Sequence, residues 1–227
     1  MGLKESGLRG SLRNVSVGID AIPDGALLYY RFDDDSDTTI AIDDIGDNDG
    51  SIDGATYDSD SLAGSNALRF GGSDRVSLPL QPLPSDGDFT AIFGVNYDDE
   101  DDNQRLFSNN DGQTGRFDFQ GVREGDPNPR LFSDQGPDFQ STVAIPTDQY
   151  AIVALRRDGD DWDIIVGTEG DVSVGASTTN SGTLDTSVNA DIGNNPSGDG
   201  GGSRALIDEV FIAESALSIS DIEDYPY

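Results

Sequence analysis

From Ile22 onward, apolar and polar residues alternate in short runs separated by clusters of Gly, Asp, Asn and Ser. A period of two predicts β-strands, because successive side chains of a strand point to opposite faces of a sheet. Many such runs with hardly any helical periodicity predict an all-β sandwich or barrel. The strands are expected at 26–32, 51–56, 66–70, 75–79, 88–97, 104–109, 115–121, 129–133, 140–145, 149–157, 162–167, 171–178, 189–193 and 205–212.

Three segments allow a more detailed prediction. In 89–97 the odd-numbered residues are mostly large and apolar, which is typical of a strand buried on one face. The run 150–157 is more uniformly apolar and is expected at the centre of a sheet; Asp158 to Asp161 then form a tight turn into 162–167. The one helical turn is expected at 218–224, where Ser218 can cap the first turn and Asp221 follows three positions on.

The runs 26–33 and 205–212 lie at opposite ends of the main body, and each contains an aspartate, Asp33 and Asp208. Two apolar strands this far apart suggest one sheet in which the first and last strands pair.

The chain has 227 residues, 44 of them acidic and 13 basic, for a formal net charge of -31. Repulsion of this size destabilises a compact state at low salt, whereas the Debye length of roughly 3 Å at molar salt removes most of it. We therefore expect a halophilic source. The alternative is an acidic disordered or calcium-buffering chain, but ten Phe, seven Tyr and one Trp favour a folded core. The same charge argues against nucleic acid and anionic membranes as partners.

Cysteine and histidine are both absent. Disulfides, imidazole ligands and Ser-His-Asp or Cys-His catalysis are therefore excluded. No apolar run approaches the roughly 20 residues that span a bilayer, so membrane insertion is not expected. The start of the chain lacks the apolar segment of a secretion signal, so export would follow a non-classical route.

Residues 1–22 differ from the rest because Lys4, Arg9 and Arg13 outnumber Glu5 and Asp20. We expect either a frayed terminus or a docking arm that orders on assembly, in front of one sandwich domain at 23–227.

Four motifs in order resemble the laminin-G-like branch of the concanavalin-A-like proteins. They are Tyr30-Arg31-Phe32-Asp33, the Gly/Asn-containing loop 43–50, the strand pair 66–78, and Ile207-Asp208-Glu209-Val210 followed by Ala216-Leu217-Ser218. The resemblance implies a jelly-roll sandwich of two antiparallel sheets.

Members of that group often hold a structural calcium between the first strand, the Gly/Asn loop and the last strand. The resemblance therefore implies Ca²⁺ bound by oxygen ligands from Asp33, Asp43, Asn48 and Asp208. The alternative is that these aspartates are surface charges of a halophilic protein.

Related glycosidases use paired carboxylates on one strand with a Glu-x-Asp-x-x-Glu spacing, which this sequence lacks. We therefore expect no enzymatic activity. The remaining function is a binding module for glycan or glycoprotein, with Trp162, Tyr97, Arg116 and Arg130 as contacts, although Trp162 suits a core or sheet-edge position better than a sugar-stacking one. A glycoside hydrolase is the least favoured alternative.

The absent secretion signal and the net positive, polar start of the chain favour a virion protein of a haloarchaeal tailed virus, on the tail or capsid surface. Residues 1–22 would dock onto other virion proteins, and the sandwich, as a homo-oligomer, would recognise a host surface glycan or S-layer glycoprotein. The alternative is a lectin-like module at the surface of a haloarchaeal cell or secreted from it.

Overall fold

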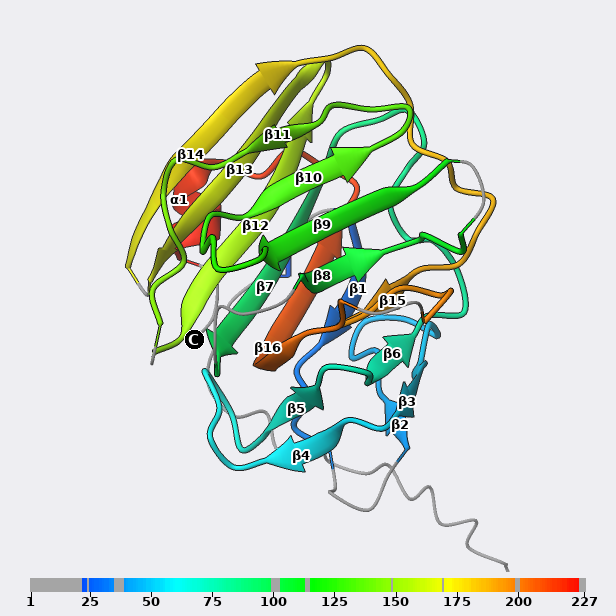
Figure 1. Ribbon diagram of the computed structural model, residues 1–227, viewed down its shortest axis with the longest axis vertical. Coiled ribbons are helices and arrows are strands. Elements are labelled where there is room, and N and C mark those ends of the chain that lie inside the picture. The colour runs from blue at the N-terminus through cyan, green and yellow to red at the C-terminus, as the bar shows by residue number, and fades with distance from the viewer. Residues whose placement is uncertain are drawn as a thin grey trace, which may run out of the picture.

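The computed structural model describes residues 22–23, 25–34, 39–98, 103–112, 115–147, 149–168, 170–198 and 201–224. The predicted docking arm 1–22 lies almost wholly outside these residues. The rest forms two antiparallel sheets of eight strands that pack face to face, as predicted (Figure 1).

Sheet A has the order β14-β13-β12-β7-β16-β5-β4, with β1 paired to β16 beside that path. Its strands are β1 (Ala26–Tyr30), β4 (Thr56–Asp58), β5 (Ala67–Gly71), β7 (Phe89–Tyr97), β12 (Ala151–Asp158), β13 (Asp161–Thr168), β14 (Asp171–Thr179) and β16 (Arg204–Ala213). The long strands β7 and β12 lie at its centre, as the apolar run at 150–157 predicts. The predicted hairpin joins β12 to β13 through Gly159, which has a φ of 61°.

Sheet B has the order β11-β10-β9-β8-β15-β6-β3-β2. Its strands are β2 (Ile40–Ala41), β3 (Gly50–Asp53), β6 (Arg75–Ser77), β8 (Gln104–Ser108), β9 (Phe117–Val122), β10 (Arg130–Ser133), β11 (Phe139–Gln140) and β15 (Asp191–Ile192). The two-residue β2 and the three-residue β4 were not predicted, because such short segments carry too little alternation to be recognised.

The strand predicted at 140–145 is mostly wrong, since β11 ends at Gln140. The next residues cross from one sheet to the other. Thr142 donates its backbone N–H to the carbonyl oxygen of Gly175 in β14 at 2.9 Å. Ser141 bonds with its hydroxyl to both backbone groups of Val143, which bends the chain out of the strand.

The first and last strands pair, as the two end segments predict. Along one edge of β16, residues 204–207 pair with β5 and residues 210–213 pair with β1. Asp208 and Glu209 lie between these two stretches, at a bulge where Glu209 has a φ of 49°. The carboxylates of the last strand therefore lie at the junction where one edge of β16 changes partner.

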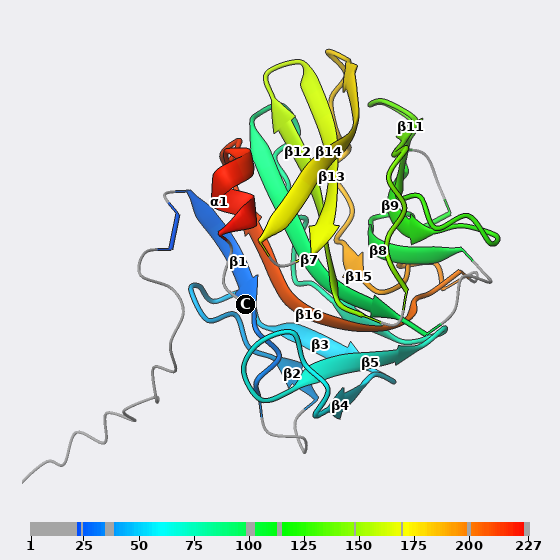
Figure 2. The ribbon, with the colours of Figure 1, turned by 90° about the vertical axis from the view of Figure 1, so that its left-hand side faces the viewer.

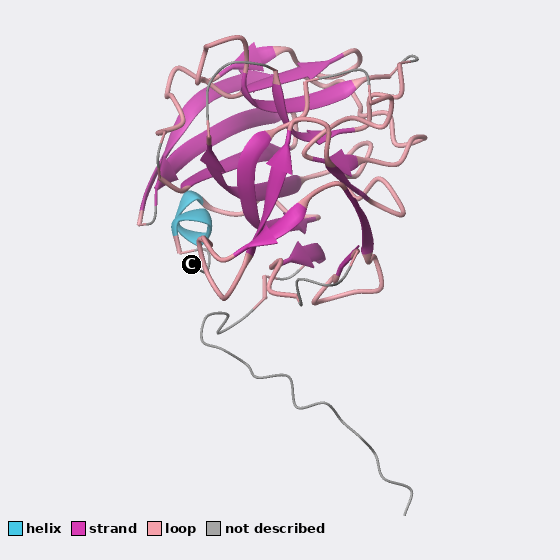
Figure 3. Cartoon of the chain, turned by 60° about the horizontal axis from the view of Figure 1, so that its bottom comes forward, coloured by secondary structure: helices cyan, strands magenta, loops and turns pink. Residues whose placement is uncertain are grey.

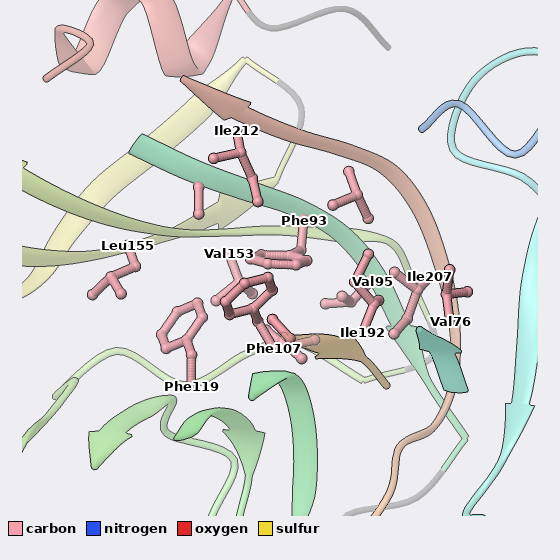
Figure 4. Close-up of a cluster of buried hydrophobic side chains, with 14 of the residues drawn as sticks. Val76, Phe93, Val95, Phe107, Phe119, Val153, Leu155, Ile192, Ile207 and Ile212 are labelled. Carbon is pink, nitrogen blue, oxygen red and sulfur yellow. The ribbon is translucent and has the colours of Figure 1, made fainter. Parts of the chain in front are cut away.

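The space between the sheets holds the main core, and Figure 4 shows part of it. Phe93 of β7 packs against Phe107 of β8 and Phe119 of β9, with ring centroids 6.3 and 6.0 Å apart. Val153, Leu155, Ile192 and Ile207 are fully buried around them. Strands of both sheets thus contribute one apolar face each to a shared interior.

The outer face of sheet A is also apolar and covered. Ile92, Ile165 and Phe211 form a second buried cluster with Leu217 and Ile222 of the C-terminal segment, which contains α1 (Ile219–Glu223). The prediction that β7 is buried on one face only is therefore wrong, because Thr90, Ile92 and Gly94 are buried as well. Ser218 caps α1 in a capping box with Asp221, as predicted. No helix in the described residues is long and apolar enough to span a membrane.

Candidate ligand-binding face

The outer face of sheet B carries polar side chains in two rows. Alternation along the strands turns Phe107, Phe119 and Leu131 toward the core and Ser108, Asp118 and Phe132 outward. The first outward row runs in register across the sheet through Ser51, Ser77, Asp191, Ser108, Asp118 and Phe132. The second contains Arg105, Gln120, Arg130 and Gln140, with Asp53 and Arg75 at its far end. These two rows, with Arg116, are called the sheet B face, which is directed toward the viewer in Figure 1.

Two predicted ligand contacts, Arg116 and Arg130, come together on this face around Phe132. The guanidinium carbon of Arg116 lies 3.6 Å from the centroid of the Phe132 ring, and that of Arg130 lies 5.7 Å from it. Such cation-π contacts hold a guanidinium in a fixed plane on the ring. Arg116, Phe132 and Arg130 therefore form one preorganised patch of a half-buried aromatic ring and two planar donors.

Aspartates fix both arginines from the side. Arg130 donates two hydrogen bonds to Asp138, from Nε at 2.9 Å and from Nη2 at 2.7 Å. Arg116 Nη2 lies 3.6 Å from Asp134, whose carboxylate also accepts the backbone N–H of Arg116 at 3.1 Å. The patch is thus rigid without being packed into the interior.

Asp118 lies at the centre of the face and is 2% exposed. It accepts hydrogen bonds from Arg105 Nε at 3.2 Å, from the Ser108 hydroxyl, and from Asn110 Nδ2 at 3.4 Å. The Asp118 carboxylate therefore holds Arg105, Ser108 and Asn110 in place and is not itself a ligand contact, because these three side chains occupy its oxygens.

The other two predicted ligand contacts lie in the interior. Trp162 is fully buried, edge-on to Phe89, with its indole N–H donated to the carbonyl oxygen of Asn180 at 3.0 Å. Tyr97 is 2% exposed, and its ring lies over Gly121. Neither ring presents a surface to a ligand, because the core between the sheets needs the largest apolar side chains of β7 and β13.

The four predicted calcium ligands fall into two pairs. Asp43 accepts hydrogen bonds from the backbone N–H of Tyr29 at 3.0 Å and of Ile45 at 3.3 Å, and from two N–H groups of Asn48, both at 3.3 Å. This pair ties the loop 43–49 to β1.

Asp33 and Asp208 form the second pair, and both bind the loop before β5. Asp208 accepts the backbone N–H groups of Leu62 at 2.8 Å and Ala63 at 3.2 Å, and that of Glu209 at 2.9 Å. Asp33 accepts the N–H groups of Ser65 and, at 3.3 Å, Asn66. An aspartate inside an apolar strand is thus explained by three backbone donors.

Burial raises the pKa values of two acids at this junction, Asp208 and Glu209. Desolvation raises the pKa of Asp208 to about 7, against the lowering effect of its backbone hydrogen bonds. Desolvation and the nearby Asp208 raise the pKa of Glu209 to about 8, although its carboxylate accepts a hydrogen bond from the Tyr29 hydroxyl, which lowers the pKa. The junction therefore holds fewer negative charges at neutral pH than its composition suggests.

The donor geometry does not fit the implied calcium site. The oxygens of Asp43 and Asp208 already accept N–H groups, and Arg31 places a guanidinium 3.6 Å from Asp33 and 2.7 Å from Asp44. Within the described residues no three acidic side chains converge in a way that could hold a metal ion. Calcium binding stays a prediction, and no step of function is assigned to it.

A polar pocket of about 420 Å³ lies on the opposite side of the molecule, on the outer face of sheet A. Arg156 donates to Asp163 from Nε at 3.0 Å and from Nη2 at 2.5 Å, and Ser177 donates its hydroxyl to the same carboxylate at 2.5 Å. The pocket is lined by polar residues, namely Arg156, Asp158, Asp161, Asp163, Ser177, Thr178 and Thr179. Without an aromatic or apolar surface, it offers less to a ligand than the sheet B face.

Comparison with known proteins agrees with this architecture. The Laminin_G_3 model, described as concanavalin A-like lectin/glucanases superfamily, matches residues 70–223, more than half of the chain. The protein therefore belongs to this family. The match includes the motif at 207–218 and most of that at 66–78, but not the motifs at 30–33 and 43–50. No curated protein matches the sequence.

Solved structures show the same fold at low sequence identity. Domain 4 of AbnA, a GH43 extracellular arabinanase from Geobacillus stearothermophilus solved in complex with arabinotriose, is 22% identical with a TM-score of 0.69, and the alignment covers 88% of this chain and 97% of that one. A mutant Trypanosoma rangeli sialidase displaying trans-sialidase activity is 15% identical with a TM-score of 0.60, over 88% of this chain. The protein spans only 32% of that sialidase.

Phe132, Asp118 and Gln120 were missed as site residues in the sequence. The signal was present, because Phe117-Asp118-Phe119-Gln120 alternates strictly and so assigns Asp118 and Gln120 to the face away from the core. Phe132 follows the same rule beside Leu131, and a large aromatic residue at an outward position is the feature that marks the site.

Proposed function

We propose that this protein is a non-catalytic carbohydrate-binding module and that the sheet B face binds the glycan. The observation that carries the proposal is the patch of Arg116, Phe132 and Arg130 on the outer face of sheet B, flanked by the exposed carboxylates of Asp134 and Asp138. Sugars present both apolar ring faces and hydroxyl groups, so they require aromatic surface and oriented polar groups together.

Membership of a family described by lectins and glucanases supports the proposal. The arabinanase domain solved with arabinotriose has the same fold over nearly its whole length. At 22% identity this likeness concerns the fold, so the choice of face depends on the residues of this chain.

The burial of the carboxylates supports a binding role over hydrolysis. A glycosidase needs two carboxyl groups that reach the scissile bond. Asp118 and Asp191, the carboxylates of the first row, are 2% and 4% exposed, and Asp118 is held by Arg105 and Ser108. The exposed carboxylates beside Phe132, Asp134 and Asp138, are ion-paired with Arg116 and Arg130. Incubation with polysaccharides and measurement of reducing ends should therefore give no release of sugar above the background.

Calorimetric titration with neutral and acidic oligosaccharides in molar KCl tests the proposal. We expect saturable binding, and about a tenfold loss of affinity in Phe132→Ala, since an aromatic contact contributes about 0.5–1.5 kcal/mol. Val174→Ala is the matched control because Val174 is a 42% exposed apolar residue of β14 in sheet A. An affinity unchanged by Phe132→Ala would place the glycan elsewhere.

The setting in which the module acts is a separate part of the proposal. The net positive segment 1–22 in a chain of charge -31 supports docking onto an acidic scaffold, such as a halophilic virus particle or a cell surface. Deleting residues 1–20 should leave the melting temperature of the sandwich unchanged and abolish co-sedimentation with particles. Undiminished co-sedimentation would contradict a docking role. Sedimentation velocity of the same two proteins tests whether the sandwich is a homo-oligomer.

A further inference from the structure

Every arginine of the sheet B face is balanced by an aspartate. Arg105 lies 3.2 Å from Asp118, and Arg130 lies 2.7 Å from Asp138. Arg116 lies 3.9 Å from Asp118 and 3.6 Å from Asp134. Arg75, at the far end, lies 3.2 Å from Asp53 and 3.8 Å from Asp191.

The charges on this face therefore sum to slightly below zero. Its four arginines, 75, 105, 116 and 130, face five aspartates, 53, 118, 134, 138 and 191. An anionic sugar placed on Phe132 would meet two guanidinium groups whose charge is already compensated. Its carboxylate would also approach Asp134 and Asp138, which are 40% and 42% exposed.

The same pairs suit an uncharged sugar. A guanidinium fixed in plane by one carboxylate offers its remaining N–H groups in a known direction, and the carboxylate offers lone pairs beside it. Adjacent hydroxyl groups of a sugar both donate and accept, so they can bridge such a pair without separating it. An anion would have to displace the aspartate first.

We propose that the ligand of the sheet B face is an uncharged glycan and that Asp134 and Asp138 enforce this selectivity by neutralising Arg116 and Arg130. The inference rests on the proposed function and adds the chemical class of its ligand. It separates this face from one that binds sialic or uronic acids.

Molar salt lets binding measurements test the selectivity of the face itself. At a Debye length of roughly 3 Å, the repulsion of a distant net charge of -31 is screened, so only contacts on the face discriminate between ligands. In 2 M KCl, arabinotriose and xylotriose represent neutral glycans, and sialyllactose and tri-galacturonate represent acidic ones. We expect the best neutral trisaccharide to bind at least tenfold more tightly than either acidic one.

The paired substitution Asp134→Asn with Asp138→Asn removes the compensating charges and keeps the side-chain size. The double variant should gain about tenfold in affinity for tri-galacturonate or sialyllactose, and this gain should shrink as salt rises. Asp158→Asn with Asp161→Asn, two substitutions at the sheet A pocket, remove the same total charge elsewhere and should leave the ratio of neutral to acidic affinities unchanged.

The outcomes separate the two proposals. Tighter binding of an acidic than of a neutral glycan by the unmodified protein would overturn the inference and leave glycan binding intact. No gain in the face variant, with an unchanged melting temperature, would overturn the role of Asp134 and Asp138. Failure to bind any of the four glycans, or any longer polysaccharide of the same sugars, would overturn the proposed function itself.

Discussion

The two outer faces of the sandwich are built in opposite ways. On sheet A, Ile92, Ile165 and Phe211 are covered by the C-terminal segment that contains α1. On sheet B, the outward row through Asp118 and Phe132 is mostly polar. In the part of the chain that the structure describes, no helix covers this sheet, and α1 lies on the side of sheet A (Figure 2). Figure 3 shows α1 at one side of the molecule, next to sheet A. The comparison shows that the apolar outer face of sheet A is covered by the chain itself, whereas the candidate binding face carries Phe132 among mostly polar side chains.

The largest expected effect separates two phenylalanines, one on each outer face. Phe211 is 1% exposed and packs edge-on against Tyr29 at 6.0 Å, so Phe211→Ala should destabilise the protein by about 3–5 kcal/mol. Phe132 is half-buried, so Phe132→Ala should cost about 1–2 kcal/mol and act mainly on glycan affinity. Urea unfolding in molar KCl measures both, and equal losses of stability would contradict the division between the faces.

The difference between the two outer faces also explains which features of the fold can be predicted from the sequence. Alternation identified most strands of both sheets, because one face of each strand enters the shared core. It could not show that β7 is buried on both faces, since the covering residues Leu217 and Ile222 come from more than 100 positions further along the chain. Tyr97 was assigned to a ligand by residue type, and only the packing between the sheets shows that it is interior. For Trp162 the core position, which was preferred over a ligand contact, is confirmed.

The predicted calcium site likewise depends on contacts between residues that are far apart in the sequence. The sequence brings Asp33 and Asp208 to one junction, and the pairing of β1 with β16 confirms that. It does not reveal that backbone N–H groups of Leu62 and Ala63 would satisfy Asp208, because those contacts span about 145 residues. Loop donors have no periodic signature in a sequence.

Acids at the sheet A junction should make stability depend on pH. Because the folded pKa values of Asp208 and Glu209 are raised to about 7 and 8, the folded state binds more protons than the unfolded chain above pH 4. The contribution of these two acids to the free energy of unfolding should therefore be greatest below about pH 4 and should decrease by several kcal/mol as the pH rises to about 8. Unfolding titrations in molar KCl at four pH values measure this slope.

Matched variants test whether the dependence of the unfolding free energy on pH comes from the acids at the junction in sheet A. Glu209→Gln should remove about half of it, since the amide oxygen can still accept a hydrogen bond from the Tyr29 hydroxyl but does not titrate, whereas Asp208 still does. Asp138→Asn on the sheet B face should leave it unchanged, because that carboxylate is exposed and paired with Arg130. A slope that survives in the double variant Asp208→Asn with Glu209→Gln would mean that other acids dominate, among them Asp191, whose pKa burial also raises.

The cap of α1 is expected to have a smaller effect on the covered face. The Ser218 hydroxyl accepts the backbone N–H of Asp221 at 3.1 Å, and the Asp221 carboxylate accepts the N–H of Ser218 at 3.0 Å. Ser218→Ala should cost about 1 kcal/mol, which lowers the melting temperature by about 2–4 °C in a protein of this size. Ser59→Ala, at an exposed bend, is the control and should change it by less than 1 °C. Glycan affinity should be the same in both, since α1 lies on sheet A.

The smallest expected effect concerns the implied calcium. Asp43 and Asp208 together accept seven N–H groups at 2.8–3.3 Å, so their oxygens already have hydrogen-bond partners, and within the described residues no group of three acids converges there to hold a metal ion. Adding a chelator in 2 M KCl should therefore shift the melting temperature by less than about 1 °C, a stability change well under 1 kcal/mol. A fall of several degrees that calcium restores and Asp208→Asn removes would instead establish the metal site at the junction. The same result with Asp43→Asn alone would place the metal in the loop 43–49, and glycan titrations with and without chelator would then show whether the metal acts on the sheet B face or only on the fold.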